Sequence, residues 1–472
     1  MALSSLAASV LQHPTRFAYL FTILALVLGW APFAIGQDTS DSNKQPAKAP
    51  FPYIHAKAFH IPPETTTEES GYFSLCEGNN GKIYIGTAAY GRNAYLVEFD
   101  PKTETMRIVL DTHRLVGLPG TATGYAAQSK LHTRNFVGPS GKIYVGSKQG
   151  YPSPAEKKEL DAGRPIPEYL GGYVMAYDPN TDQAENFGMP MPLTAEQRAQ
   201  GIKEGQGVID VAADEARGLL YVITCEAQHW MLYDMAKKSF RDLGPTLKDQ
   251  PNTLIDARGR GTAITDRYEI ARYEPETNQV SVVPLMVGNQ TFADVLGKDR
   301  VHPDWRITRD GKTAYLQLLN DLRMFRVDLS GDTKQPVAAV DLGNRIQGDN
   351  PDSRGSISIG PDGAVYSVIR IDNKTNFGTG YLHHLIRHDP MRGTMTDLGV
   401  IAISNPSFFN FDAGPGKNED GSPRPTHGFH RLPDNTLTPL HVVLAMIVTR
   451  DGTIYATTLY PFTLMRIEPL KE

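Results

Sequence analysis

Histidine, tyrosine and arginine residues recur in the segments that border short apolar strands of this 472-residue chain. Side chains of these types can together carry out β-elimination on a uronic-acid polysaccharide. An arginine neutralises the carboxylate, a base removes the neighbouring proton, and an acid protonates the leaving oxygen. We therefore predict a site for an acidic carbohydrate, built from His132, Arg134, Tyr90, Tyr151, Arg306, Arg354, Trp305 and Tyr381.

The spacing of two of these residues suggests their roles. His132 and Arg134 are two positions apart, which places both side chains on one face of a strand. We predict that His132 is the base, that Arg134 or Arg306 neutralises the carboxylate, and that Tyr90 or Tyr151 is the acid. Any one of these residues could instead serve only to hydrogen-bond a neighbouring part of the fold. The residues predicted to bind substrate are Arg306, Arg354, Trp305 and Tyr381.

A second set of residues resembles a metal site. His427 and His430 are three positions apart in a Pro-rich segment, and Gln228 and His229 lie next to each other. Imidazoles with an oxygen ligand suit zinc, manganese or copper, so a divalent metal is a possible cofactor. The alternative is that the His-x-x-His spacing arose by chance, since it is not diagnostic.

Composition and missing motifs exclude several classes of protein. The net charge is −5, from 47 basic and 52 acidic residues, and no basic block stands out, so we expect no nucleic-acid partner. The two cysteines, Cys76 and Cys225, are predicted to be separate buried thiols rather than a disulfide. The sequence contains no Gly-x-Ser-x-Gly elbow, P-loop, His-Glu-x-x-His motif or haem-attachment motif.

The elements that would position these residues form a repeat. One short apolar strand, usually opened by a glycine turn, occurs seven times, with copies that begin at Gly81, Gly141, Gly218, Gly261, Lys312, Gly363 and Gly452. A second strand that often ends in an acidic residue follows each copy, and most repeats are spaced by about 40 to 60 residues. Short β-branched and aromatic strands joined by tight turns form antiparallel meanders.

We predict an all-β protein, a seven-bladed β-propeller of four-stranded antiparallel blades. The last copy ends near Glu472 after three strands, so its blade lacks an outer strand. The alternating segment 54–61 can supply that strand from the other terminus and close the ring. In such a ring, the segments leading into the innermost strands share one face with the loops between the second and third strands. The residues listed above fall on that face.

The chain divides into three parts in this interpretation. Residues 1–36 are a signal peptide or signal anchor, 37–52 a flexible tether, and 53–472 a single propeller. The uncharged run 17–36 ends in small residues suited to cleavage, and Arg16 precedes it. We therefore expect a secreted or periplasmic protein that touches a membrane only through an uncleaved anchor. Three insertions are expected in the propeller, near 150–171, 189–205 and 405–440.

The segments GKIYIGT…YLVEFDPKTETMRIVLD and GKIYVGS…GGYVMAYDPNTDQAENFGMP resemble exported bacterial propellers of the broad YVTN, SMP-30-like and oligogalacturonate-lyase-like groupings. The resemblance covers nearly all of 53–472. Propeller polysaccharide lyases of that kind use His, Tyr and Arg, in some cases with a metal held by His and Gln. The resemblance thus implies the same fold and is compatible with the same residue types.

Two functions remain open at this point. The first is an enzyme acting on an acidic carbohydrate, an eliminating polysaccharide lyase. The second is a non-catalytic propeller that binds a glycan, a small ligand or a partner protein through its insertions, with an aromatic surface at Phe408, Phe409 and Phe411. We expect a monomer in both cases.

Overall fold

The computed structural model describes residues 48–118, 123–150, 152–202, 204–248, 252–297, 302–332, 334–413 and 428–470. They belong to one compact unit, Pro46–Glu472. The predicted leader lies outside the described residues, as do Tyr151 and His427. No helix in the described ranges is long and apolar enough to cross a membrane.

Antiparallel meanders follow one another along the chain, as predicted from the repeat. The first two consist of β2 (Glu69–Glu77), β3 (Ile83–Ala88), β4 (Tyr95–Asp100) and β5 (Thr105–Asp111), then β7 (Phe136–Val137), β8 (Ile143–Lys148), β9 (Val174–Asp178) and β10 (Gln183–Gly188). A short extra strand, β6 (Lys130–Leu131), pairs with both β3 and β8.

The middle of the chain repeats this arrangement. Its meanders are β11 (Gly207–Asp214), β12 (Leu219–Cys225), β13 (His229–Asp234) and β14 (Ser239–Thr246), then β15 (Leu254–Ile255), β16 (Gly261–Ile264), β17 (Glu269–Glu274) and β18 (Gln279–Val287), then β20 (Pro303–Ile307), β21 (Thr313–Leu318), β22 (Arg323–Asp328) and β23 (Val337–Asn344). The short strand β19 (Gln290–Thr291) pairs with β18.

The two ends of the chain meet in the last sheet. After β24 (Ile357–Ile359), β25 (Val365–Asp372), β26 (Tyr381–Asp389) and β27 (Thr394–Ile403) comes the meander β30 (Ala445–Val448), β31 (Ile454–Thr458) and β32 (Thr463–Ile467). Strand β1 (Tyr53–His60) pairs antiparallel with β32, so the N-terminal strand closes the ring as predicted.

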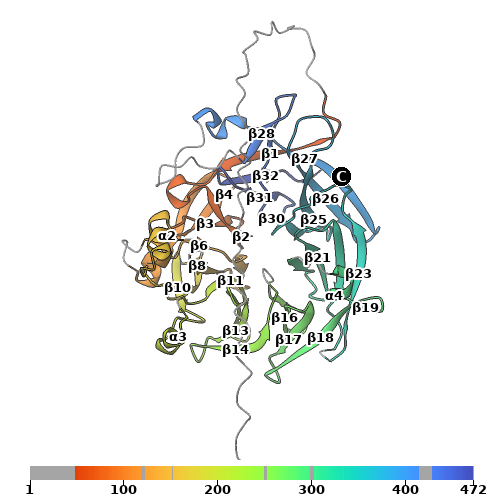
Figure 1. The fold of residues 1–472 in the computed structure, drawn as a ribbon. Coiled ribbons are helices and arrows are strands. Elements are labelled where there is room, and N and C mark those ends of the chain that lie inside the picture. Colours follow the sequence, from red (N-terminus) through yellow and green to blue (C-terminus); the bar gives the residue numbers. More distant parts are fainter. Residues whose placement is uncertain are drawn as a thin grey trace, which may run out of the picture. The chain divides into compact units, whose positions relative to one another are not determined.

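The innermost strands are arranged around a common axis (Figure 1), and we call the region along that axis the channel. Strand β2 contacts β7 on one side and β30 on the other, β30 contacts β24, and β24 contacts β20. On the opposite side β7 contacts β11, and β11 contacts β15. The fold is an all-β propeller. Pairings between neighbouring meanders, such as β18 with β23 and β27 with β1, merge the strands into larger sheets, so the count of seven blades stays a prediction.

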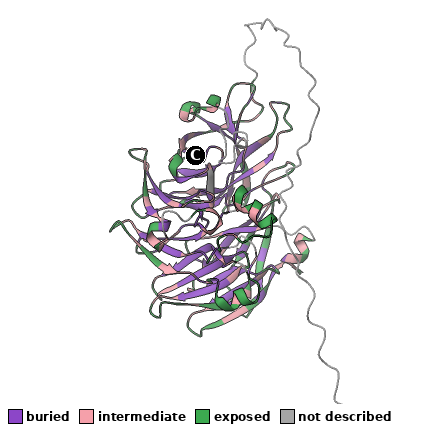
Figure 2. Ribbon diagram, turned by 60° about the vertical axis from the view of Figure 1, so that its left-hand side comes forward, coloured by how far each residue is buried: buried purple, intermediate pink, exposed green. Residues whose placement is uncertain are grey.

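The core lies between the sheets. Figure 2 shows buried residues along the strands and exposed residues in the turns and helices. Strand β3 is buried over its whole length, whereas the outer strand β5 alternates exposed and half-buried residues. Strands covered on both faces read as continuous apolar runs, which is why the repeated copies stand out in the sequence.

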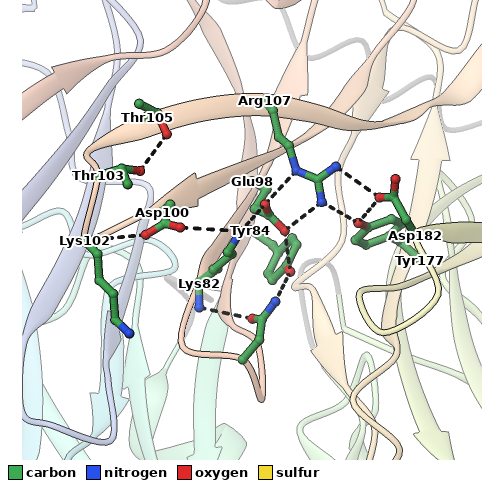
Figure 3. A network of polar contacts seen from close by, with 11 residues as sticks. Lys82, Tyr84, Glu98, Asp100, Lys102, Thr103, Thr105, Arg107, Tyr177 and Asp182 are labelled. Carbon is green, nitrogen blue, oxygen red and sulfur yellow. Dashed lines mark hydrogen bonds and ion pairs between the residues drawn. The ribbon is translucent and has the colours of Figure 1, made fainter.

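Polar networks also join neighbouring meanders, and the one around Glu98 is the clearest (Figure 3). Glu98 on β4 accepts hydrogen bonds from Lys82 Nζ and Tyr84 Oη, both at 2.8 Å. Arg107 Nε donates to Glu98 Oε1 at 2.8 Å, and Arg107 Nη2 reaches Tyr177 Oη of the next meander at 3.0 Å. We call Lys82, Tyr84, Glu98, Arg107, Tyr177 and Asp182 the Glu98 network.

Two of the four α-helices in the described residues lie in the predicted insertions. Helix α2 (Pro154–Asp161) lies in the first insertion and α3 (Ala195–Ala199) in the second, and both begin with capping boxes. An ion pair of 2.8 Å between Arg198 Nε and Glu168 Oε2 connects the two segments. The third insertion contains the strands β28 (Phe429–Arg431) and β29 (Leu437–Pro439). The remaining helices are α1 (Thr112–Val116) and α4 (Phe292–Leu296).

Candidate functional site

Tyr72 is the centre of a polar cluster on the face where the sequence placed its candidates. It lies in β2, where the pairing with β3 shifts register between Ser70 and Leu75. Its φ is +66°, a strained backbone for an aromatic residue. Lys130 Nζ lies 4.2 Å from the centre of its ring and the Arg354 guanidinium 5.8 Å. Two cations therefore flank one half-buried tyrosine.

Tyr90 and Lys130 form the first side of this cluster. Lys130 Nζ donates to Tyr90 Oη at 2.8 Å. Tyr90 lies in the loop between β3 and β4, and a Cβ on Gly150 would stand 2.7 Å from Tyr90 Cδ1. The glycine at the start of the first insertion thus allows the tyrosine ring to lie against the backbone. A neighbouring ammonium stabilises negative charge on a phenol oxygen, which suits a group that transfers protons.

His132 packs edge-on against two aromatic rings. Its ring centre lies 5.1 Å from that of Tyr72 and 5.8 Å from that of Phe73. Burial lowers the pKa of His132 well below its ordinary value, and the charges of Lys148, Lys130 and Arg134 lower it further. The imidazole is therefore neutral at pH 7, and its residue is 7% exposed.

Arg134 lies deeper, within the channel. Its guanidinium stacks on Phe73 at 4.4 Å, and its Nη2 donates to Asp304 Oδ1 at 2.7 Å. Arg306 Nη1 donates to the same oxygen at 2.6 Å. His132 and Arg134 both contact Phe73, but neither lies in a regular strand, because β6 ends at Leu131 and β7 begins at Phe136. The strand geometry predicted for this pair is therefore wrong, although the two side chains do lie on the same ring.

Trp305 is a core residue, contrary to its predicted role in binding substrate. It is 0% exposed, and its Nε1 donates to the backbone oxygen of Asn252 at 2.8 Å. The ring belongs to the apolar cluster that contains Leu316 and Phe325. Side chains alternate along a strand, so Trp305 of β20 points away from the face that Asp304 and Arg306 share.

Arg354 and Arg370 form the second side of the cluster. Both approach Asp352, with Arg354 Nε at 3.6 Å and Arg370 Nη2 at 3.2 Å from its oxygens. The Arg370 guanidinium also stacks on Tyr381 at 4.3 Å. Two cations share one carboxylate, which leaves excess positive charge. The structure thus brings Arg354 and Tyr381, two of the predicted substrate-binding residues, into one chain of contacts.

Two imidazoles surround these arginines. Burial lowers the pKa of His441 to about 4, and the charges of Arg354 and Arg370 add to this effect. Burial likewise lowers the pKa of His383 well below its ordinary value, with Arg370 as the next cause. His441 Nδ1, His383 Nε2, Arg354 Nε and Arg370 Nε are all buried without a hydrogen-bond partner among the described residues. Buried polar atoms normally have partners, so this group of residues is a candidate ligand site.

We call these residues the axial cluster. Its members are Tyr72, Tyr90, Lys130, His132, Asp352, Arg354, Arg370, Tyr381, His383 and His441. Sequence reasoning did not assign a role to Tyr72, Lys130, Arg370 or His441. The linear sequence does not show that the backbone of Tyr72 is strained. It also does not show that Arg354 approaches the Tyr72 ring from another blade.

The residues predicted to bind a metal come from separate parts of the fold. His229 on β13 pairs with Asp242 Oδ2 at 2.8 Å, and Gln228 precedes it in a turn with φ of +50°. His430 lies on β28. Within the described ranges, no group of three or more His, Cys, Asp or Glu residues could hold a metal ion. Because His427 lies outside those ranges, the metal site stays a prediction.

Two further predictions concern the thiols and the aromatic insertion. Cys76 and Cys225 are both buried and free, as predicted. Phe408, Phe409 and Phe411 pack on one another, and Phe408 and Phe411 also contact Phe429 with ring centres 5.8 and 5.6 Å apart. These three rings are half-buried against the propeller rather than fully exposed as a binding surface.

Comparison with known proteins found similar solved structures only. No protein-family model matches the chain, and no curated protein does. The extracellular domain of the hybrid two-component system BT3049 from B. thetaiotaomicron is similar at 12% identity and a TM-score of 0.46, over 88% of this chain and 41% of that one. This chain therefore spans less than half of the BT3049 chain.

WD40 propellers are similar as well. The WD40 repeats of RRP9 match at 8% identity and a TM-score of 0.48, over 89% of this chain and 100% of that one. The β-propeller domain of Myceliophteria thermophila Cps50 (Swd1) matches at 8% identity and 0.47, over 87% and 99%. Propellers host many unrelated functions, so such identities carry no information on activity.

Proposed function

We propose that the protein is an exported enzyme that cleaves an acidic polysaccharide by β-elimination at the axial cluster. The observation that carries the proposal is the set of buried arginine and imidazole nitrogens without partners, next to a strained tyrosine flanked by two cations. We infer a place among exported propellers of the YVTN, SMP-30-like and oligogalacturonate-lyase-like groupings. Export itself rests on the predicted leader.

In this mechanism Arg354 and Arg370 hold the carboxylate of a uronate. Two guanidinium groups that share only Asp352 have charge left for a second carboxylate. Neutralising the carboxylate stabilises the negative charge that develops when the neighbouring carbon loses its proton. A double bond then forms between that carbon and the next one, and the bond from the latter to the glycosidic oxygen breaks.

Tyr90 and Tyr72 are the candidates for proton transfer. Lys130 Nζ donates to Tyr90 Oη at 2.8 Å and lies 4.2 Å from the centre of the Tyr72 ring, so one cation lies beside both phenols. One tyrosine removes the proton next to the carboxylate and the other protonates the leaving oxygen. His132, neutral and packed against Tyr72, would act as a positioning residue rather than as the base predicted from the sequence.

The test is to incubate the purified protein with a panel of uronate polysaccharides and to record the absorbance of unsaturated products. Arg354→Ala should lower kcat/KM by about 100-fold or more, since it removes a charge that acts on the transition state. Arg392→Ala is the matched control, because the Arg392 side chain is 80% exposed in the turn that follows β26, at the opposite end of that strand from Tyr381. Absence of unsaturated product from every polysaccharide, with and without divalent metal, would overturn the proposal.

A further inference from the structure

A separate cavity lies inside the channel. It has a volume of about 290 Å³ and is lined by Phe73, Leu75 and Glu77 of β2, by Arg134 and Arg306, and by Met446, Ile447 and Val448 of β30 among others. The lining of β2 from Phe73 to Glu77 spans about 13 Å at the usual rise per residue. A water molecule in the liquid occupies about 30 Å³, so the cavity has room for a molecule of several heavy atoms.

A small hollow shares lining residues with both the channel cavity and the axial cluster. Phe73 and Arg134 line the cavity, and both also line this hollow of about 10 Å³, which Asp304 and Arg354 share. A hollow of this size holds about one water molecule. Because Arg354 lines the hollow but not the larger cavity, a ligand in the channel and a ligand at the axial cluster contact different residues.

The charge around the channel cavity is unbalanced. Arg134 and Arg306 both donate to a single oxygen of Asp304, and Arg134 Nε and Nη1 have no partner among the described residues. A further carboxyl, Asp210, is buried, and burial raises its pKa to about 7 against the opposing effect of Arg134. The two guanidinium groups thus exceed the negative charge beside them.

The two ends of the cavity differ in character. The arginines lie with Asp304 near Phe73, whereas Glu77 at the other end of the β2 lining is already paired with Arg450 at 3.1 Å. Between them Ile447 and Val448 contribute half-buried apolar side chains, whereas Leu75 and Met446 are buried in the adjoining apolar clusters. Guanidinium groups bind the paired oxygens of carboxylates and phosphates, and apolar walls accommodate hydrocarbon.

We propose that the channel binds a small organic oxyanion, a carboxylate or phosphate monoester with a short apolar group, through Arg134 and Arg306. The head group lies at the arginines and the apolar part lies along β2 and β30. This ligand is distinct from the polysaccharide of the proposed function, because Arg134 and Arg306 line the cavity that holds it, whereas Arg354 and Arg370 do not.

The proposal is tested by calorimetric titration of the full chain with benzoate, phenyl phosphate and inorganic phosphate in a chloride buffer. We expect saturable one-to-one binding of benzoate or phenyl phosphate, tighter than that of inorganic phosphate. Arg306→Gln should weaken this binding at least tenfold. The variant should fold, since Asp304 keeps its bond to Arg134. Arg326→Gln, at an exposed arginine of β22, is the matched control and should bind as the unmodified protein does.

The outcomes separate the two proposed sites. Retention of benzoate or phenyl phosphate binding in Arg354→Ala, with its loss in Arg306→Gln, supports a channel site whatever the result of the polysaccharide assay. Binding lost in Arg354→Ala but kept in Arg306→Gln would place the anion at the axial cluster and overturn the channel proposal. No saturable binding of either organic anion would overturn it as well.

Discussion

The Glu98 network and the axial cluster are both rich in Arg, Tyr and carboxylate, yet they differ in how fully their polar atoms are paired. In the Glu98 network, Glu98 is 2% exposed and accepts bonds from Lys82, Tyr84 and Arg107. Burial opposes the ionisation of Glu98, but these hydrogen bonds outweigh it, so its pKa is lowered. No side-chain atom of this network is buried without a partner.

The axial cluster shows the opposite pattern. In four of its residues a buried nitrogen has no hydrogen-bond partner in the described part of the chain: Arg354, Arg370, His383 and His441. A folded chain gains stability when buried polar groups pair and loses it when they do not. We conclude that the Glu98 network joins neighbouring blades. The axial cluster instead contains unpaired buried donors, which lower stability and could bind a ligand. Residue types alone do not distinguish the two.

The largest effect is expected from breaking the paired region. Glu98→Ala leaves Lys82 and Arg107 without their buried carboxylate, so we expect a loss of about 3–5 kcal/mol in the free energy of unfolding. Urea denaturation measures this loss. Glu185→Ala, whose exposed side chain lies 3.4 Å from Lys142 Nζ, is the control and should cost less than about 1 kcal/mol. Equal effects of the two variants would refute the assignment of Glu98 to a stabilising role.

A smaller effect, with a defined pH dependence, is expected at His441. The folded protein favours the neutral imidazole, since its pKa falls from 6.5 to about 4. The contribution of His441 to the free energy of unfolding is therefore complete above pH 6.5. It is lost as the pH falls toward 4, by at most about 3 kcal/mol. His441→Phe should remove this contribution and flatten the decline. Unfolding curves at pH 7.5 and pH 4.5 measure the difference, and an unchanged decline in the variant would contradict it.

The smallest change in stability is expected at Arg370. Arg370→Ala leaves Asp352 with Arg354, so we expect the free energy of unfolding to change by about 1 kcal/mol. The same variant should nevertheless weaken the binding of uronate oligomers by about tenfold or more. Thermal unfolding and titration with those oligomers give the two values. A loss of stability as large as that of Glu98→Ala would show that the two regions have the same role.

The repeat made the fold predictable, while the site was only partly so. The continuous apolar run in Gly81–Gly86 and its copies indicates burial on both faces of a strand, which is a local property of the sequence. His132 and Arg354 were found because segments that lead into inner strands meet at the axis of a ring, and Tyr381 because the loops between second and third strands share that face. Trp305 was misassigned because one position of register decides whether a side chain meets the channel or the core.

The sequence by itself determined the all-β repeat, the closing strand from the N-terminus and the face on which His, Tyr and Arg gather. These follow from periodicity and turn residues, which act over a few positions. Only the tertiary structure decided that Tyr72 lies between Lys130 and Arg354, and that Arg134 and Arg306 share Asp304 in the channel. Except for Arg306 with Asp304, these contacts join residues more than 50 positions apart, and their free energies depend on burial and pairing that arise only when the ring closes.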